Sequence, residues 1–265
     1  MPVANLENIS IYYEEQGAGK PLLLLHGLGS DGRSWEYQIE PFAEQFRVIV
    51  VDVRGHGRSA KPPGPYSVAQ FTGDIFALLD HLEVDQFHLV GLSMGGMIGF
   101  QMAVDQPQRL KSLTIVNSGP ELVPRGLKEK WQILQRRLIL NLLSMEKIGE
   151  FIGGRLFPEP HQAEYKEKFV QQMGENDPRA YKAATNALIG WSVSSELDCI
   201  QCPVLIISGD MDYTPVAVKE AYMRQLPTSQ LHVIENSRHA TPVDQPEAFN
   251  TAVLNFLHTV SEKRV

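Results

Sequence analysis

Short apolar segments alternate with amphipathic ones along the first part of the chain. Each apolar segment is strand-length and rich in Val, Ile, Leu and Phe, as strands buried on both faces of a parallel sheet are. The amphipathic segments between them, of which 68–82 is the clearest, carry apolar residues at helical spacing. This alternation predicts a doubly wound, mainly parallel α/β sheet that binds ligands at the carboxyl ends of its strands. The predicted strands are 9–15, 21–26, 46–52, 87–90 and 110–116.

The pattern changes after residue 120. Residues 121–196 contain helix-like stretches interrupted by glycine and proline, but no convincing strand. We therefore predict a core domain formed by residues 1–120 and 197–265, and a helical cap, or lid, formed by residues 121–196. Such an insertion at the end of a strand would lie over the active-site face; the alternative is a helical subdomain that only packs. Within the second part of the core we expect strands at 203–208 and 230–234 and helices at about 216–225 and 246–257.

The composition limits the binding partners and the cellular compartment that we expect for this protein. Of the 265 residues, 43% are hydrophobic and 21% are charged, which is typical of a globular protein. The net charge is −7 and no basic cluster stands out, so neither nucleic acid nor an anionic membrane is an expected partner. The first residues lack the basic start and apolar core of a secretion signal, and the apolar runs are too short to span a bilayer. We expect a cytoplasmic protein without a membrane span, and the sequence leaves a homodimer open.

The two cysteines, Cys199 and Cys202, have the C-x-x-C spacing of redox and metal sites. A redox pair needs a helix N-terminus to stabilise its thiolate, whereas Pro203 and a predicted strand follow here. A structural zinc site needs four ligands, and the chain has no second cysteine pair. We therefore interpret both cysteines as small apolar residues of a connector, and expect no metal and no other cofactor.

The strongest chemical signal is Gly91-Leu92-Ser93-Met94-Gly95, a match to G-x-S-x-G. The bare motif often occurs by chance, but here a predicted strand precedes it and a helical pattern follows it. A serine on such a turn has a strained backbone that lifts its hydroxyl clear of the sheet. The amide of Met94, at the start of the helix, would point toward negative charge that forms beside the serine.

A serine hydroxyl becomes a good nucleophile when a base removes its proton and a carboxylate orients that base. After Ser93 the chain offers an aspartate and then a histidine at strand exits, the order expected for a nucleophile on such an elbow. His239 follows the last predicted strand and is the candidate base. For the acid we favour Asp212 over Asp210, because Asp212 directly precedes the start of the next predicted helix. His26 and His56 lie in glycine-rich loops, which we expect them to shape.

Acyl transfer also needs two preorganised N–H donors for the oxyanion. Met94 would supply one, and Leu28, in the glycine-rich loop after the strand 21–26, would supply the other. No carboxylate occupies Asn117 or Ser118, so the exit of the strand 110–116 offers no alternative acid.

Taken together, these motifs resemble the α/β-hydrolase superfamily, and within it small bacterial carboxylesterases, 3-oxoadipate enol-lactonases and perhydrolase-like esterases. The resemblance implies the α/β-hydrolase fold, a helical cap inserted after the sixth strand, a Ser-His-Asp triad and no cofactor. The motifs that carry it are His26-Gly27-Leu28-Gly29, Asp52-x-Arg54-Gly55-x-Gly57-x-Ser59, Gly91-x-Ser93-Met94-Gly95-Gly96, Gly209-x-x-Asp212 and His239.

We expect a carboxylesterase-type enzyme that cleaves a small-molecule ester or lactone through an acyl-enzyme. Ser93 excludes an aspartate nucleophile at the elbow. The candidate pocket residues are Gly27, Trp131, Trp191 and Tyr213, and the apolar residues of the cap suggest a modestly hydrophobic substrate. Two alternatives stay open: a carbon–carbon hydrolase or lyase that uses the same triad, and a ligand sensor with slow turnover.

Overall fold

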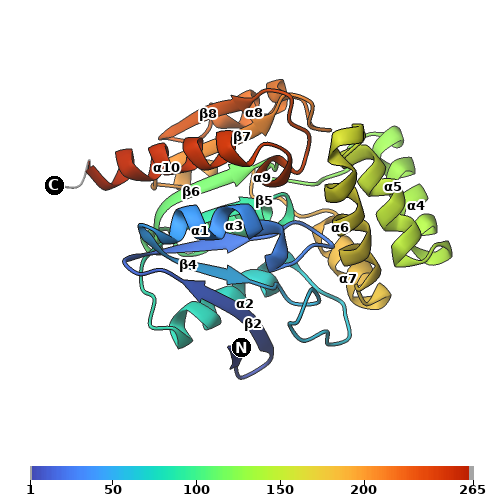
Figure 1. Ribbon diagram of the computed structural model, residues 1–265, viewed down its shortest axis with the longest axis horizontal. Helices are drawn as coiled ribbons and strands as arrows, with labels where there is room; N and C mark the ends of the chain where they lie inside the picture. The colour runs from blue at the N-terminus through green and yellow to red at the C-terminus, as the bar shows by residue number, and fades with distance from the viewer. Residues whose placement is uncertain (1, 263–265) are drawn as a thin grey trace.

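In the computed structural model, which describes residues 2–262, one twisted sheet forms the centre of the molecule (Figure 1). Within these residues the sheet has eight strands in the order β1-β2-β4-β3-β5-β6-β7-β8. The pairs β1–β2 and β2–β4 are antiparallel and every other pair is parallel. The strands are β1 (Val3–Asn5), β2 (Ser10–Gln16), β3 (Lys20–Leu25), β4 (Phe46–Val51), β5 (Phe87–Leu92), β6 (Leu110–Val116), β7 (Val204–Gly209) and β8 (Ser229–Ile234).

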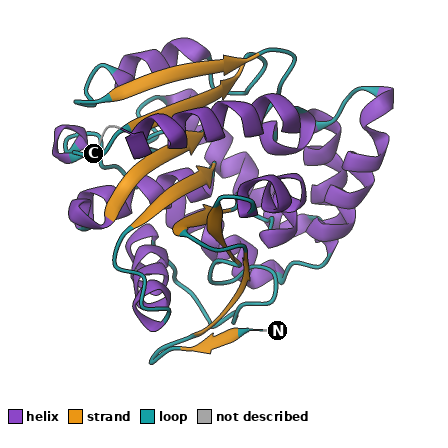
Figure 2. Cartoon of the chain, turned by 60° about the vertical axis from the view of Figure 1, so that its left-hand side comes forward, coloured by secondary structure: helices purple, strands orange, loops and turns teal. Residues whose placement is uncertain are grey.

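Helices cover both faces of this sheet (Figure 2). In β3, Leu22 and Leu24 point to the face covered by α1 and α10, whereas Leu23 and Leu25 point to the face covered by α2 and α3. Because successive strand residues point to opposite faces, both sets are buried, which explains the continuous apolar run. The helices of the core are α1 (Glu36–Ala43), α2 (Val68–His81), α3 (Met94–Asp105), α8 (Val216–Met223), α9 (Thr241–Asp244) and α10 (Pro246–Glu262).

The helices between β6 and β7 lie together at one side of the molecule, on the right in Figure 1. Backbone hydrogen bonds join the two ends of this insertion, from Val193 N–H to Pro120 O (2.9 Å) and from Leu122 N–H to Trp191 O (2.9 Å). The insertion therefore leaves and rejoins the sheet at a closed neck. Its helices are α4 (Leu127–Leu142), α5 (Met145–Leu156), α6 (Ala163–Gly174) and α7 (Pro178–Leu188).

The predicted doubly wound sheet is confirmed, and so is a helical insertion after the sixth strand. The prediction missed the edge strand β1, which is too short to show a periodic pattern, and the four-residue helix α9. The segment 121–196 contains no strand in the described chain, apart from a single bridge between Glu121 and Ser192 at the neck. None of the described helices is both long and apolar enough to cross a bilayer.

Candidate active site

Ser93 lies on a sharp turn between β5 and α3. Its φ of 52° is in the left-handed region that non-glycine residues avoid, as expected of a strained elbow. The neighbouring glycines let the chain turn this tightly: a Cβ on Gly91 would lie 2.3 Å from Gly95 O, and one on Gly95 would lie 2.1 Å from Leu25 O. The Ser93 amide donates to Val116 O at 2.9 Å, which ties the elbow to β6. The sequence motif is therefore a genuine strand-to-helix elbow.

The loop after β3 borders the elbow, because the position of a Cβ on Gly27 would lie 3.6 Å from Ser93 Cβ. The fully buried His26 holds this loop in place. Val53 N–H donates to His26 Nε2 at 3.0 Å, so the ring proton is on Nδ1 and is donated to Gly27 O at 2.8 Å. This geometry supports the predicted shaping role of His26. It also places Leu28, the next residue, beside the elbow.

Asp212 and His239 meet, although 27 residues separate them in the sequence. Asp212 lies in the loop after β7, and its Oδ1 is 2.6 Å from His239 Nδ1 in the loop after β8. Asp210 instead accepts the amide proton of Ser237 at 3.0 Å and so stabilises the loop that carries the histidine. In the part of the chain that the structure describes, the Ser93 hydroxyl makes no hydrogen bond to His239.

The side chain of Asn117 joins the loops that carry the aspartate and the histidine. Asn117 directly follows β6, has a φ of 45° and is buried. Its Oδ1 accepts the amide proton of Gly209 at 2.9 Å, and its Nδ2 donates to Arg238 O and His239 O at 3.0 and 2.9 Å. Sequence reasoning considered this position only as one without an acid. An amide suits it because it offers a donor and an acceptor at once.

Lys219 of α8 is a second residue that sequence reasoning missed. Its side chain is fully buried, and its Nζ forms an ion pair with Asp212 Oδ2 and donates to Thr214 O. Burial alone would raise the pKa of Asp212, but the hydrogen bonds and charges of His239 and Lys219 outweigh it and hold that pKa below its ordinary value. The carboxylate therefore stays ionised between two partners.

A family model described as alpha/beta hydrolase fold matches residues 20–246, most of the chain. This chain belongs to the α/β-hydrolase fold family. The predicted resemblance is thereby confirmed, together with the fold and a carboxylesterase-type hydrolase as the class of enzyme.

Other proteins, some of them with solved structures, match this α/β hydrolase over nearly its whole length. A 3-oxoadipate enol-lactonase of Acinetobacter baylyi is 32% identical, over 93% of this chain and 92% of its own. A putative carbamate hydrolase, RutD, of Caulobacter sp. is 31% identical, over 93% of this chain and 95% of its own. Among solved structures, a thermophilic esterase from Thermogutta terrifontis superposes with a TM-score of 0.86 at 29% identity, over 98% of both chains.

The four candidate pocket residues lie in different surroundings. Gly27 borders the elbow, and the Tyr213 ring stacks on the His239 ring with 4.1 Å between centroids. Trp191 lies at the neck of the insertion, where its Nε1 donates to Gln101 Oε1 at 2.7 Å. Trp131 of α4 has a side chain that is 59% exposed, and it lines neither of the two cavities described below.

A cavity of about 340 Å³ lies beside Tyr213. Its lining includes Met211 of the same loop, and also Arg155 and Arg238. The insertion contributes Gly154, Arg155 and Pro158 to this mixed lining, and the apolar lining expected for the substrate pocket stays a prediction.

The motif Asp52-x-Arg54-Gly55-x-Gly57-x-Ser59 has a structural role in this α/β hydrolase. The buried Asp52 accepts the amide protons of Gly32 and Arg58, each at 2.8 Å, and so holds the loops after β3 and β4 together. A Cβ on Gly57 would lie 2.2 Å from Asp52 Oδ2, which requires glycine there. The motif thus stabilises the loop after β3, which carries Leu28.

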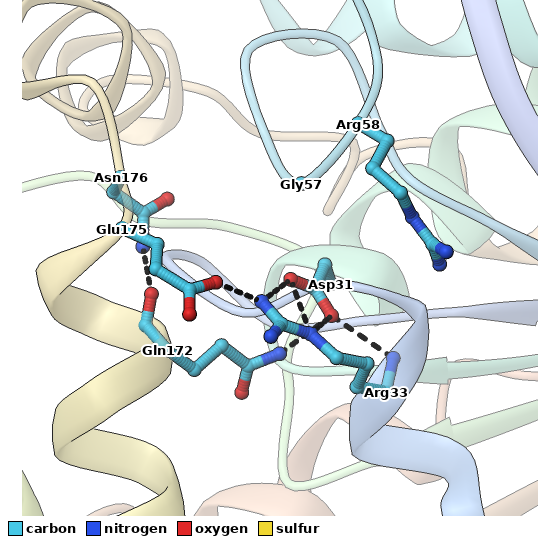
Figure 3. A pocket seen from close by; sticks show the side chains of 7 residues that line it. All are labelled: Asp31, Arg33, Gly57, Arg58, Gln172, Glu175 and Asn176. Atoms are coloured by element: carbon cyan, nitrogen blue, oxygen red, sulfur yellow. Dashed lines mark hydrogen bonds and ion pairs between the residues drawn. The ribbon is translucent and has the colours of Figure 1, made fainter.

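A polar cleft of about 220 Å³ separates the end of α6 from the loops after β3 and β4 (Figure 3). Side chains bridge it: Gln172 Nε2 donates to Asp31 Oδ1 at 2.6 Å, and Arg33 pairs with Glu175 at 2.6 Å. Asn176 Nδ2 donates to Gly29 O at 2.9 Å, one residue beyond Leu28. These contacts attach the insertion to the loop beside the elbow.

Proposed function

We propose that this chain hydrolyses carboxylic esters with Ser93 as nucleophile, His239 as general base and acid, and Asp212 as the group that orients His239. The observation that carries the proposal is the 2.6 Å contact between Asp212 Oδ1 and His239 Nδ1, at the same sheet edge as the strained elbow. Family membership supports it, since esterases and an enol-lactonase are among the relatives.

The reaction would proceed by acyl transfer. Because His239 Nδ1–H donates to Asp212, Nε2 is free to accept the Ser93 proton as Ser93 Oγ attacks the ester carbonyl. The amides of Leu28 and Met94 would bind the oxyanion that forms. His239 then protonates the leaving alkoxide as the acyl–oxygen bond breaks. A water that the same ring deprotonates attacks the acyl-enzyme and releases the carboxylic acid and Ser93.

We further propose that residues 121–196 form a cap over this site. Two apolar clusters support this assignment. One packs Leu28 against Met145, Met173 and Tyr181 of the insertion, and the other packs Ala240, the residue after the candidate base, against its helices. The cap would therefore contact both the oxyanion loop and the histidine loop, and would shape the acyl or alcohol pocket.

The substrate class follows from the triad and the relatives. The enol-lactonase and the esterase are both named for the cleavage of carboxylic esters, one of them cyclic, so we propose small to medium acyl esters or lactones. No metal or other cofactor is needed for this reaction, because the triad and the two amides supply the nucleophile, the proton carrier and the charge stabilisation.

The test is hydrolysis of p-nitrophenyl acetate, butyrate and octanoate by the wild type and by Ser93→Ala. We expect release of p-nitrophenol by the wild type and loss of essentially all of it in Ser93→Ala, with an unchanged thermal midpoint. Ser195→Ala, at an exposed serine near the neck, is the control and should keep full activity. Release that persists in Ser93→Ala would refute the triad. No release by the wild type would instead favour a carbon–carbon hydrolase, a lyase or a slow-turnover sensor.

A further inference from the structure

A buried cation that acyl transfer does not require contacts the candidate triad. Lys219 of α8 has no exposed side-chain surface, and neither has Asp212, its partner. Removing two charges from water is costly, and their attraction offsets that cost only when the geometry is good and the remaining donors find acceptors. Here Nζ meets Asp212 Oδ2 and Thr214 O, so the ammonium is well satisfied.

The carboxylate of Asp212 is shared between two partners, His239 and Lys219, on opposite oxygens. Oδ1 faces His239 Nδ1 at 2.6 Å, and Oδ2 faces Lys219 Nζ. A carboxylate held through one oxygen can rotate about its χ2 torsion, whereas one held through both oxygens cannot. The lysine therefore fixes the plane of the carboxylate that in turn orients the imidazole.

The other charged and titratable groups near the His239 ring lie farther from the Asp212 carboxylate. Tyr213 stacks on the ring, and Arg155 lies 5.9 Å from the centroid of Tyr213. Arg238 precedes the histidine and lies 4.0 Å from Glu159. Around the same loops are Arg136, Asp210, Tyr222 and Asp244. Within the described chain, Lys219 is the cation in direct contact with the carboxylate.

We propose that Lys219 is a positioning residue of the triad that also sets the pH range over which His239 works as a base. This inference rests on the proposed function. The imidazolium that forms when Ser93 loses its proton is stabilised by the Asp212 carboxylate. A positive charge on the far oxygen offsets part of that stabilisation. Without Lys219, the Asp212 carboxylate would stabilise that imidazolium more strongly, and activity would extend less far into the acidic range.

The experiment compares Lys219→Met, which removes charge and donor, with Lys219→Gln, which removes the charge but keeps a donor. We expect the acidic limb of the kcat/KM profile to move up by about one pH unit in both, because the lost lysine carries the same charge as the imidazolium. Because Gln can still hold the carboxylate, we expect a smaller fall in plateau kcat for Lys219→Gln than for Lys219→Met. Arg109→Met is the matched control: Arg109 is also buried and paired, but it directly precedes β6, at the amino ends of the strands and away from the triad.

If Lys219 had only a structural role, replacing it would lower the stability, as Arg109→Met should, but would not move the acidic limb of the kcat/KM profile upward. An acidic limb that stays in place or moves down in Lys219→Gln would overturn the proposal. Histidine-selective NMR of the His239 ring gives a second readout that does not depend on turnover. Suppose that the wild type cleaves no ester, but that the titration midpoint of His239 is higher in Lys219→Gln than in the wild type. The ester-hydrolase proposal then fails, while the role of Lys219 stands. A midpoint that does not rise refutes that role.

Discussion

His56 makes this protein sensitive to acid through a group outside the proposed triad. Its ring is completely buried beside His26, with 5.1 Å between the ring centroids, and its Nδ1–H donates to Arg54 O at 3.0 Å. Burial, followed by the electrostatic effect of the neighbouring His26 ring, lowers the pKa of His56 from 6.5 to about 3. The folded protein thus keeps this ring neutral at pH values where the unfolded chain protonates it.

The sign and size of the effect follow from proton linkage. Below pH 6.5 the unfolded state binds a proton that the folded state does not, so stability is complete above pH 6.5 and falls as the pH falls toward 3. Each pH unit in this window removes about 1.4 kcal/mol. Between pH 6.5 and 4.5 the ring should therefore remove roughly 3 kcal/mol from the free energy of unfolding.

The assay is urea unfolding of the wild type and of His56→Gln at several pH values in this window. Glutamine is neutral throughout and can still donate to the Arg54 carbonyl. We expect it to be less stable than the wild type at pH 7, and expect the difference to shrink by roughly 3 kcal/mol by pH 4.5. Both proteins carry the same carboxylates, so the difference isolates the histidine. His161→Gln, at an exposed histidine of the insertion, should show no such change. A stability difference that stays constant with pH would refute the reasoning.

Two further predictions concern the elbow and the choice of acid. Gly95→Ala should lower the free energy of unfolding by about 1–3 kcal/mol and reduce kcat, because its Cβ would lie 2.1 Å from Leu25 O. The control is Gly73→Ala, in an exposed part of α2 with nothing within 4 Å of the added carbon, and it should raise stability by about 0.5–1 kcal/mol. An equal loss of stability in the two variants, measured by thermal unfolding, would contradict the clash. Asp212→Asn should lower kcat by roughly 10⁴-fold in the p-nitrophenyl ester assay, whereas Asp210→Asn should be tolerated. Equal losses in these two variants would undo the choice of Asp212.

The parts of the fold and site that could be predicted are those whose chemistry is local in the sequence. The elbow follows from two glycines around Ser93 between a strand and a helix. Asp212 and His239 directly follow strands, and parallel strands bring their carboxyl ends to one edge, so the order along the chain was enough to place them.

The missed residues act across the fold. Asn117 matters because its amide bridges two loops that are more than 90 residues away in the sequence. Lys219 lies in a helix where a lysine ordinarily faces water, and its spacing from Asp212 says nothing about burial. Trp131 shows the opposite case, since a tryptophan expected in a pocket lies on an exposed helix face.

The closed neck of the insertion separates changes in the insertion from changes in the sheet and its loops. Because Val193 N–H bonds to Pro120 O and Leu122 N–H to Trp191 O, the sheet meets the same pair of chain ends whatever lies beyond them. Helices there can lengthen, shift or exchange side chains while the register of β6 and β7 is kept. Substitutions in the proposed cap can therefore accumulate in one continuous stretch of the chain, while Ser93, Asp212 and His239 lie on the other side of that neck.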